Sequence, residues 1–319
     1  MKILVTGGAG YIGSVLVALL LEAGHEVVVL DNLSHGHRDA VSKGASFIEA
    51  DVADIRQALI GHGDIEAVIH LAAYIAAGES MTKPELYWRN NTVATLSMFE
   101  GIMALGIRKL IFASTAAVYG DPQTIPIAED APKVPTNTYG MTKLASDMAI
   151  TSYCLAHGLA ATSVRFFNVA GAYKGWGERH PAETHIIPLA FDVASGRRQH
   201  FSLFGDDYPT PDGTCIRDYI HVADLAQAIL LALDKLKPGK HSIYNLGNGS
   251  GFSNRQLIAA VEKVTGTTLP VLVEPRREGD PAVLVASSEL AHTELGWLPA
   301  RPNLEDIVAD AWRFYQASR

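Results

Sequence analysis

Short apolar runs alternate with longer amphipathic segments along the first half of the chain. The runs expected to form strands cover residues 2–6, 26–30, 45–50, 68–73, 108–113 and 160–165. Between them, apolar residues that recur every three or four positions predict helices, among them 84–106 and 138–157. Strands that are apolar on both faces are typical of a parallel sheet covered by helices on both sides. The alternation therefore predicts an α/β fold with a doubly wound parallel sheet of about seven strands.

The second half of the chain follows a different pattern. Glycines, prolines and charged residues replace the regular alternation over residues 171–188, although 242–246 resembles another strand of the first sheet. We therefore expect a first domain at 1–168 with return segments near 215–248. Residues 169–319 should form mainly a smaller C-terminal lobe.

A glycine-rich loop follows the first expected strand. Gly7, Gly10 and Gly13 precede an apolar-periodic helix, so that backbone amides and the helix N-terminus can face a pyrophosphate. Asp31 ends the second strand 18 residues after Gly13, where a carboxylate accepts hydrogen bonds from an adenosine ribose. Because that carboxylate would repel a 2′-phosphate, the pattern predicts a Rossmann-type fold that binds NAD.

Tyr139 and Lys143 are candidates for proton transfer. Four residues apart on a helix, they would project from one face, and a nearby ammonium favours a phenolate. Taken alone, such a pair more often belongs to a solvated helix surface. Thr115, at the end of a central strand, brings a hydroxyl to the same crevice. His70 lies inside an apolar strand, and we expect it to be an interior histidine.

Composition narrows the class of protein. The 319 residues are 48% hydrophobic and carry a formal charge of −8 with a pI of about 5.8, which argues against nucleic-acid and anionic-membrane partners. Cys154 and Cys215 have no metal-binding or disulfide spacing, so we expect no metal site. We see no signal-peptide pattern and no run of the roughly 20 apolar residues that span a bilayer. We expect a cytoplasmic protein.

Several motifs together resemble a known family. They are GGAGYIG (7–13), STAAVYG (114–120), YGMTK (139–143), RFFNVAG (165–171), YPTPDGTCIRDYIHVADL (208–225), YNLGNG (244–249) and RREGDPA (276–282). Over essentially the whole chain, they are similar to the extended short-chain dehydrogenase/reductases and, within them, to the UDP-glucose 4-epimerase family. The two motifs at 208–225 and 244–249 are the most specific to that family.

The resemblance implies roles for individual residues. Tyr139 would act as base and acid, Lys143 would lower its pKa, and Thr115 would contact the sugar O4. NAD would be bound by Gly7, Gly10, Tyr11, Ile12, Gly13, Asp31, Asn32, Asp51, Val52, Leu71, Ala72, Ala73, Asn90, Ser114, Tyr139, Lys143 and Phe166. The UDP-hexose substrate would contact Thr115, Tyr139, Asn168, His185, Phe201, Arg217, Tyr219, Arg277, Asp280 and Leu284.

The chain departs from the family at a few positions. Ile75 stands where the family often has a lysine near the cofactor phosphate. Phe166 stands at the position of a frequent tyrosine, and His185 at that of a frequent asparagine. We expect these departures to change the affinity for NAD and substrate more than the catalytic chemistry. Leu284 lies where family members with strict specificity have a tyrosine. Its smaller side chain suggests that N-acetylated UDP-sugars are also accepted.

The resemblance implies C4 oxidation of a UDP-hexose, rotation of the keto sugar and re-reduction, in a homodimer formed through helices 84–106 and 138–157. A dehydratase is disfavoured because Ala116 and Ala117 replace the acid pair such enzymes need. Two alternatives stay open. They are a UDP-uronic acid 4-epimerase and a non-catalytic NAD-sensing protein with the same fold.

Overall fold

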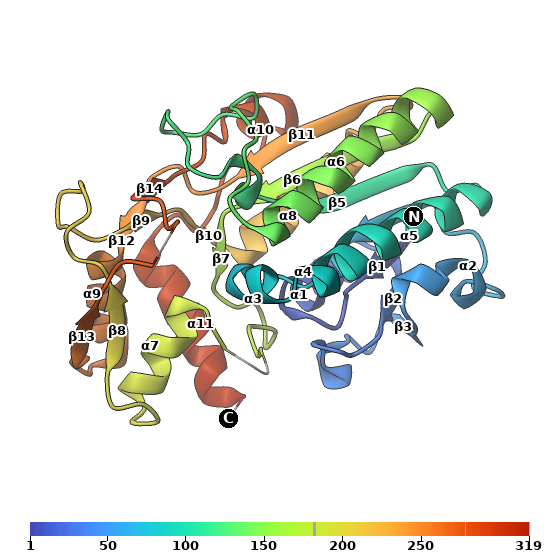
Figure 1. Ribbon diagram of the computed structural model, residues 1–319. Helices are drawn as coiled ribbons and strands as arrows, with labels where there is room; N and C mark the ends of the chain where they lie inside the picture. The colour runs from blue at the N-terminus through green and yellow to red at the C-terminus, as the bar shows by residue number, and fades with distance from the viewer. Residues whose placement is uncertain (181–182, 278, 319) are drawn as a thin grey trace.

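A seven-stranded parallel sheet forms the centre of the molecule in the part of the chain that this computed structural model describes, residues 1–180, 183–277 and 279–318 (Figure 1). Glu278 of the 276–282 motif lies outside these residues. The strand order is β11-β6-β5-β4-β1-β2-β3. The bounds are β1 (Lys2–Thr6), β2 (Glu26–Asp31), β3 (Ser46–Glu49), β4 (Ala67–His70), β5 (Lys109–Thr115), β6 (Ala160–Phe166) and β11 (His241–Leu246). The predicted doubly wound sheet is confirmed, including its late strand from the second half.

Helices cover both faces of this sheet. Alternate residues of each strand point to opposite faces, and each set packs in its own apolar core. One core includes α1 (Tyr11–Glu22), α8 (Val222–Asp234) and α10 (Glu289–Leu295), and the other includes α2 (Ile55–Ala58), α5 (Ala94–Ala104) and α6 (Thr138–His157). Figure 1 shows α5 and α6 running side by side across one face. The strand order changes direction between β1 and β4, which opens a crevice at their carboxyl ends.

The expected helix at 84–106 is not regular. It begins as α4 (Pro84–Tyr87), widens into a π-helical turn, η3 (Trp88–Val93), and continues as α5. A short helix, α3 (Ala77–Thr82), precedes it. π-helical turns are frequent at functional sites because the extra residue redirects side chains. Here the widened turn carries Asn90 and Asn91 toward the crevice.

The smaller lobe lies beyond the carboxyl ends of the central strands (Figure 1). Its strands form short sheets, β7 (Asn168–Ala170) with β10 (Tyr219–His221), β8 (Phe201–Phe204) with β13 (Val271–Glu274), and β9 (Ile216–Arg217) between β12 (Phe252–Ser253) and β14 (Val283–Leu284). Helices α7 (Ile186–Ala194), α9 (Asn254–Thr265) and α11 (Leu304–Ala317) share its core. Short 3₁₀ turns occur at η1 (Arg38–Ala40), η2 (Val52–Asp54) and η4 (Ala116–Tyr119).

Cys154 and Cys215 are free thiols, and both are buried. In the described part of the chain, no helix is long and apolar enough to cross a membrane.

A buried ion pair joins α6 to the central strands. An Arg165 guanidinium nitrogen lies 3.0 Å from the Asp147 carboxylate, and the two side chains are only 2% and 4% exposed. Arg165 also donates to the Tyr119 hydroxyl at 2.8 Å, which in turn donates to Asn245 of β11 at 2.7 Å. Ser114 of β5 donates to Asp147 at 3.0 Å. One polar network thus holds α6, three strands of the central sheet and the turn that contains Tyr119.

We predict that Arg165→Met destabilises the protein by about 3–5 kcal/mol, because it leaves the Asp147 carboxylate buried without a cation. The double variant Arg165→Met with Asp147→Leu should recover most of this loss, since it removes both charges. Chemical denaturation of the two variants and the wild type measures the difference. A double variant as unstable as the single one would show that packing, and not the charge, accounts for the loss.

Candidate functional site

The glycine loop brings α1 unusually close to β1. Gly7 adopts a φ of +72°, and its amide donates to the Leu30 carbonyl at 2.9 Å. A Cβ on Gly13 would lie 2.2 Å from the Gly7 carbonyl oxygen, so only glycine fits there. Gly10 occupies the N-cap of α1. The helix N-terminus therefore faces the crevice with free backbone amides, as a bound pyrophosphate requires.

Tyr11 and Ile12 form the first turn of α1. The Tyr11 hydroxyl donates to the Gly171 carbonyl at 2.6 Å, which joins the glycine loop to the start of the second lobe. Burial raises the pKa of Tyr11 well above its usual value, and the carboxylates of Glu178 and Glu183 add to this effect. Tyr11 is therefore a neutral phenol with a positioning role at this edge of the crevice.

Two carboxylates follow β2 and β3 at the same edge of the sheet. Asp31 accepts hydrogen bonds from the amide of Ala9 at 3.0 Å and from the amide two residues after itself at 2.9 Å. Asp51 accepts from the Asn32 side chain at 3.0 Å and caps the short helix that begins at Val52. These contacts hold both acids in fixed positions beside the glycine loop. The donor and acceptor set fits an adenosine ribose and an adenine edge.

The loop after β4, residues 71–73, borders the crevice on its other side. Asn91 holds it in place, because its side chain accepts from the Tyr74 amide at 2.9 Å and donates to the Tyr74 carbonyl at 2.8 Å. Asn90, the predicted cofactor residue, donates to Asn91 at 2.9 Å. Sequence reasoning noted both asparagines but did not assign Asn91 this role. An amide pair inside an apolar helix was the available signal.

Tyr139, Lys143 and Thr115 come together at the carboxyl end of β5. Tyr139 lies in the first turn of α6, and its amide donates to Ser80 Oγ at 3.1 Å. Its hydroxyl lies close enough to the Thr115 side chain for that side chain to lower its pKa. Lys143 is 3% exposed and donates from Nζ to the Ala113 carbonyl at 2.9 Å. Tyr139 and Lys143 lie on the predicted helix one turn apart, and their joint role with Thr115 stays a prediction.

The pKa values differ from the expectation. Burial raises the pKa of Tyr139 to about 12, and the Thr115 side chain opposes this only in part. Burial also lowers the pKa of Lys143 to about 8, against the attraction of Asp147. The expected lowering of the Tyr139 pKa by Lys143 does not appear, because burial dominates and the Ala113 carbonyl binds the ammonium. A cation bound in the crevice beside the phenol would favour the phenolate.

Other predicted residues near β5 differ in the contacts that their side chains make. Ser114 donates its hydroxyl to Asp147, so its side chain serves the buried ion pair, and its predicted cofactor contact depends on its backbone. Phe166 ends β6 opposite the hydroxyl-bearing end of β5. His70 is buried and lies 2.7 and 3.1 Å from two threonine hydroxyls, and burial lowers its pKa to about 3. The expectation of an interior histidine is confirmed.

A second cavity opens in the smaller lobe. It holds about 780 Å³ of empty space, partly open to solvent, and Phe201, Arg277 and Asp280 line it as predicted. The Arg277 guanidinium lies 3.9 Å from the centroid of the Phe204 ring, and Arg217 pairs with Asp280. The predictions missed the other lining residues, among them the polar side chains of Arg198, His200 and Asn254. Cations beside an aromatic ring in an open cavity suit a nucleoside diphosphate.

Three further predicted residues lie between the cavity and β5. Asn168 of β7 and Tyr219 of β10 are register partners, and the Tyr219 hydroxyl is buried without a hydrogen-bond partner among the described residues. Leu284 packs against the apolar cluster that includes Ala116 and Phe167, directly after Thr115 and Phe166. The structure therefore places Leu284 near the end of β5, as its predicted role beside the sugar requires.

His185 differs from the other predicted substrate residues. Its Nδ1 lies 2.7 Å from Glu178 Oε1 and 3.1 Å from Glu183 Oε1. Although burial alone would lower its pKa, the hydrogen bonds to the two carboxylates raise it to about 10. Its neighbours Thr184 and Ile186 line the cavity, but His185 itself is not among the lining residues. Its predicted substrate contact stays a prediction.

His185 also belongs to a group that the expectation of no metal site did not anticipate. Side-chain donors of Glu178, His180 and His185 all lie within 4.8 Å of one another, in the residue types that bind metals. The signal in the sequence was a Glu-x-His-x-x-Glu-x-His spacing over residues 178–185, which contains no cysteine.

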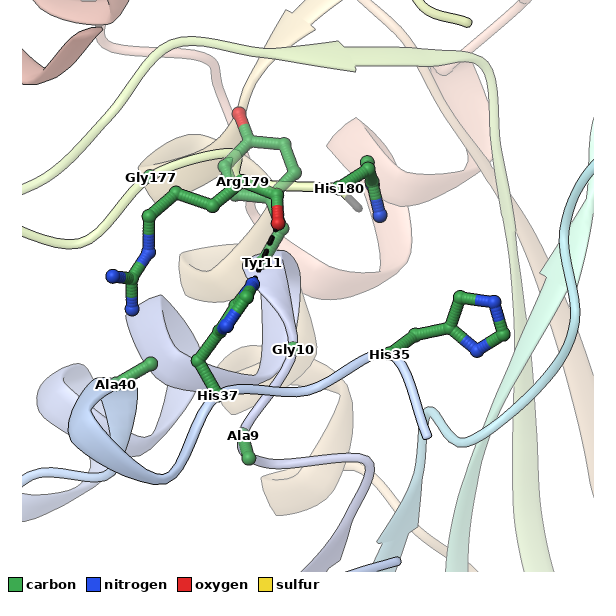
Figure 2. Close-up of a pocket in the computed structure, with 9 residues that line it drawn as sticks. All are labelled: Ala9, Gly10, Tyr11, His35, His37, Ala40, Gly177, Arg179 and His180. Atoms are coloured by element: carbon green, nitrogen blue, oxygen red, sulfur yellow. Dashed lines mark hydrogen bonds between the residues drawn. The ribbon is translucent and has the colours of Figure 1, made fainter. Parts of the chain in front are cut away.

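This segment closes the outer edge of the crevice. Figure 2 shows His37 pointing at the backbone of Arg179, where its Nε2 lies 2.7 Å from the carbonyl oxygen. Arg179 also forms two hydrogen bonds with Asp39, at 3.0 and 2.7 Å. Ala9, Gly10 and Tyr11 lie beneath these contacts in the same small pocket. The start of the second lobe is thereby fastened over the glycine loop.

Comparisons with known proteins agree with this geometry. The sequence model of the NAD dependent epimerase/dehydratase family matches residues 3–247. The chain is 54% identical over 317 residues to a UDP-glucose 4-epimerase of Corynebacterium glutamicum, covering 99% of this chain and 96% of that protein. It is 52% identical over 319 residues to a UDP-glucose 4-epimerase of Streptomyces lividans, with 99% and 96% covered.

Solved structures show the same likeness. A crystal structure of a UDP-glucose 4-epimerase superimposes with a TM-score of 0.95 at 46% identity, covering 99% of this chain and 98% of that one. The enzyme from Brucella ovis, solved in complex with NAD, has a TM-score of 0.94 at 40% identity, with 98% of both chains covered.

Proposed function

The chain belongs to the NAD-dependent epimerase/dehydratase family, and we propose that it acts as a UDP-glucose 4-epimerase with NAD as its cofactor. It interconverts UDP-galactose and UDP-glucose. The observation that carries this conclusion is the approach of Tyr139 to Thr115 at the carboxyl end of β5, where Lys143 of the same helix binds the Ala113 carbonyl. The pair lies where the crevice of the glycine loop meets the second lobe.

Tyr139 is the group that moves the proton. Its phenolate accepts the proton of the sugar 4-hydroxyl as C4 is oxidised, and the phenol returns that proton when the 4-keto oxygen is reduced. NAD, when bound, accepts the hydride from C4 and later returns it to the opposite face. Thr115 orients the reacting oxygen by a hydrogen bond. Lys143 holds its charge beside the same point, anchored by the Ala113 carbonyl.

The two halves of the chain divide the binding. We assign the cofactor to residues 1–168 with the return segments near 215–248, and the UDP-sugar mainly to 169–319. Arg277 lines the cavity of the smaller lobe, and Arg217 pairs with Asp280 of the same lining, so both supply charge for a diphosphate. Because the keto sugar must rotate between the two hydride transfers, firm contacts should hold the nucleotide while the hexose stays loosely held.

We also assign the protein to a reducing compartment, the cytoplasm. Two thiols, Cys154 and Cys215, are retained in free form in apolar surroundings, and burial raises the pKa of Cys154 to about 11. Thiols of this kind are ordinary packing groups in reducing surroundings.

We predict that Tyr139→Phe lowers kcat by about 10²–10⁴-fold, because the phenyl ring keeps the shape but cannot carry the proton. Proton NMR of UDP-galactose incubated with purified protein measures the formation of UDP-glucose. The matched control is Tyr153→Phe on the same helix, which should keep wild-type turnover. Unchanged turnover in Tyr139→Phe, with NAD still bound, would favour the non-catalytic NAD protein.

The pocket beside Leu284 sets the range of sugars in our proposal. Leu284 is only partly buried and packs on a small apolar cluster next to Thr115. A leucine there leaves space that a tyrosine would fill. We therefore propose that UDP-N-acetylgalactosamine and UDP-N-acetylglucosamine are also interconverted.

We predict that Leu284→Tyr lowers kcat/KM for UDP-N-acetylgalactosamine at least about tenfold, while UDP-galactose turnover changes little. The larger side chain fills the space for the N-acetyl group, and a misfit of one or more methylenes in a pocket costs roughly this factor. Leu284→Met, which keeps the volume, should leave both substrates unchanged. The NMR assay with each substrate measures the ratio. If the wild-type protein does not turn over the N-acetylated sugar, the proposal about the Leu284 pocket is wrong, while the proposed epimerase activity on UDP-galactose still stands.

An exposed apolar stripe on α6 supports a homodimer. Met141, Met148 and Leu155 are seven residues apart, so they lie on one face of the helix, and Met148 and Leu155 are 65% and 80% exposed. Val93 on the adjoining helical segment is also exposed. We propose that α5 and α6 of two copies pack together along this stripe.

We predict that the wild type elutes as a particle of twice the 34.2 kDa chain mass and that Met148→Glu shifts it to the monomer, because the stripe cannot bury an unpaired carboxylate. Light scattering after gel filtration gives both masses. Met148→Leu is the control that should stay dimeric. A monomeric wild type, or a dimer unaffected by Met148→Glu, would move the interface elsewhere.

A further inference from the structure

Four metal-ligating side chains meet outside the reaction centre, in the segment between β7 and α7. They are Glu178, His180, Glu183 and His185. The Glu178 carboxylate is 2.7 Å from His185 Nδ1 and 3.5 Å from His180 Nε2, and the Glu183 carboxylate is 3.1 Å from His185 Nδ1. The Glu178, His180 and Glu183 side chains are between 9% and 20% exposed, whereas the His185 side chain is 44% exposed, so the group opens to water on the His185 side.

Two features of the group are not explained by contacts within the protein. The second oxygen of Glu183, Oε2, is buried and has no hydrogen-bond partner among the described residues. His180 and His185 also place their rings 5.0 Å apart, with no stacked geometry. A protonated His185 between the two carboxylates would account for one imidazole, but not for the second imidazole or for the unpaired oxygen. Buried carboxylate oxygens normally have partners, and the open Glu183 oxygen is available to a cation.

We propose that Glu178, His180, Glu183 and His185 bind one divalent transition-metal ion of the zinc class. Imidazole nitrogen favours zinc, copper, iron and nickel over calcium and magnesium, and carboxylate oxygen completes a tetrahedral zinc site. Bond lengths near 2.0–2.2 Å place tetrahedral ligand atoms roughly 3.3 Å apart. Three of the six separations are 2.7, 3.1 and 3.5 Å, on either side of that value. The donors of Glu178, His180 and His185 already lie within 4.8 Å of one another, and Glu183 would have to turn toward them to complete the four.

The four side chains lie where the second lobe contacts the glycine loop, so a metal ion bound there would have a structural role. Tyr11, whose pKa responds to Glu178 and Glu183, opens α1 in the glycine loop. Arg179, between two of the ligands, binds His37 and Asp39 of the loop after β2. An ion at this site would fix the start of the second lobe against the cofactor edge of the first. With four protein ligands it would have no open position for chemistry.

The test measures metal binding by the full-length protein. Protein stripped with a chelator is titrated with Zn²⁺, bound metal is counted by mass spectrometry, and Co²⁺ serves as a visible probe of tetrahedral coordination. We expect one Zn²⁺ per chain and a higher Tm when it is bound. The double variant Glu178→Gln with His180→Asn should bind Zn²⁺ at least about tenfold more weakly, since even outer-shell changes cost 10–100-fold.

Controls separate this site from other surface donors and from the epimerase. His157→Asn removes an exposed imidazole from the end of α6 and should bind Zn²⁺ like the wild type. His180→Asn alone is a milder variant, used if the double variant does not fold. Equal Zn²⁺ affinity in wild type and folded His180→Asn would overturn the proposal, as would tighter binding of Ca²⁺ or Mg²⁺. Tyr139→Phe should keep its Zn²⁺, so an inactive epimerase and a missing metal site are told apart.

Discussion

The buried ion pair of Arg165 and Asp147 is the interaction on which the rest of the reaction centre depends. Asp147 lies one helical turn after Lys143 on α6, and Arg165 lies on β6 beneath it. Through Ser114 and Tyr119 the pair also holds β5 and β11. Because both charges are removed from water, the pair is stable only over a small range of distances and angles, and this fixes the position of α6 along the sheet. The position of α6 along the sheet determines where Tyr139 approaches Thr115.

The reversal of strand order is the second constraint. Parallel strands place all their carboxyl ends at one edge, and the reversal between β1 and β4 leaves a gap there. The glycine loop, Asp31, Asp51 and the Thr115 hydroxyl reach this gap from strands far apart in the chain. The second lobe lies across the same edge. One crevice therefore serves a dinucleotide on one side and a sugar nucleotide on the other.

Local signals identified much of this arrangement. Apolar periodicity predicted the central strands and the helix that carries Tyr139 and Lys143, and the glycine spacing predicted a close contact of α1 with β1. Other features carry no local signal. The π-helical turn at 88–93, the support of the 71–73 loop by Asn91 and the Lys143 contact with Ala113 all depend on residues distant in sequence. The predicted shift of the Tyr139 pKa was wrong in direction, because the burial of the phenol depends on all the residues packed around it.

The sequence by itself determined the α/β class, the nucleotide loop and the identity of the reacting side chains, since spacing along one helix or turn fixes which groups share a face. The tertiary structure alone decided what those groups touch. It turned Ser114 away to Asp147, paired Arg217 with Asp280, and gathered Glu178 with the two histidines of the 178–185 segment. Such contacts follow from the packing of separate elements, and residue spacing within one element holds no information about them.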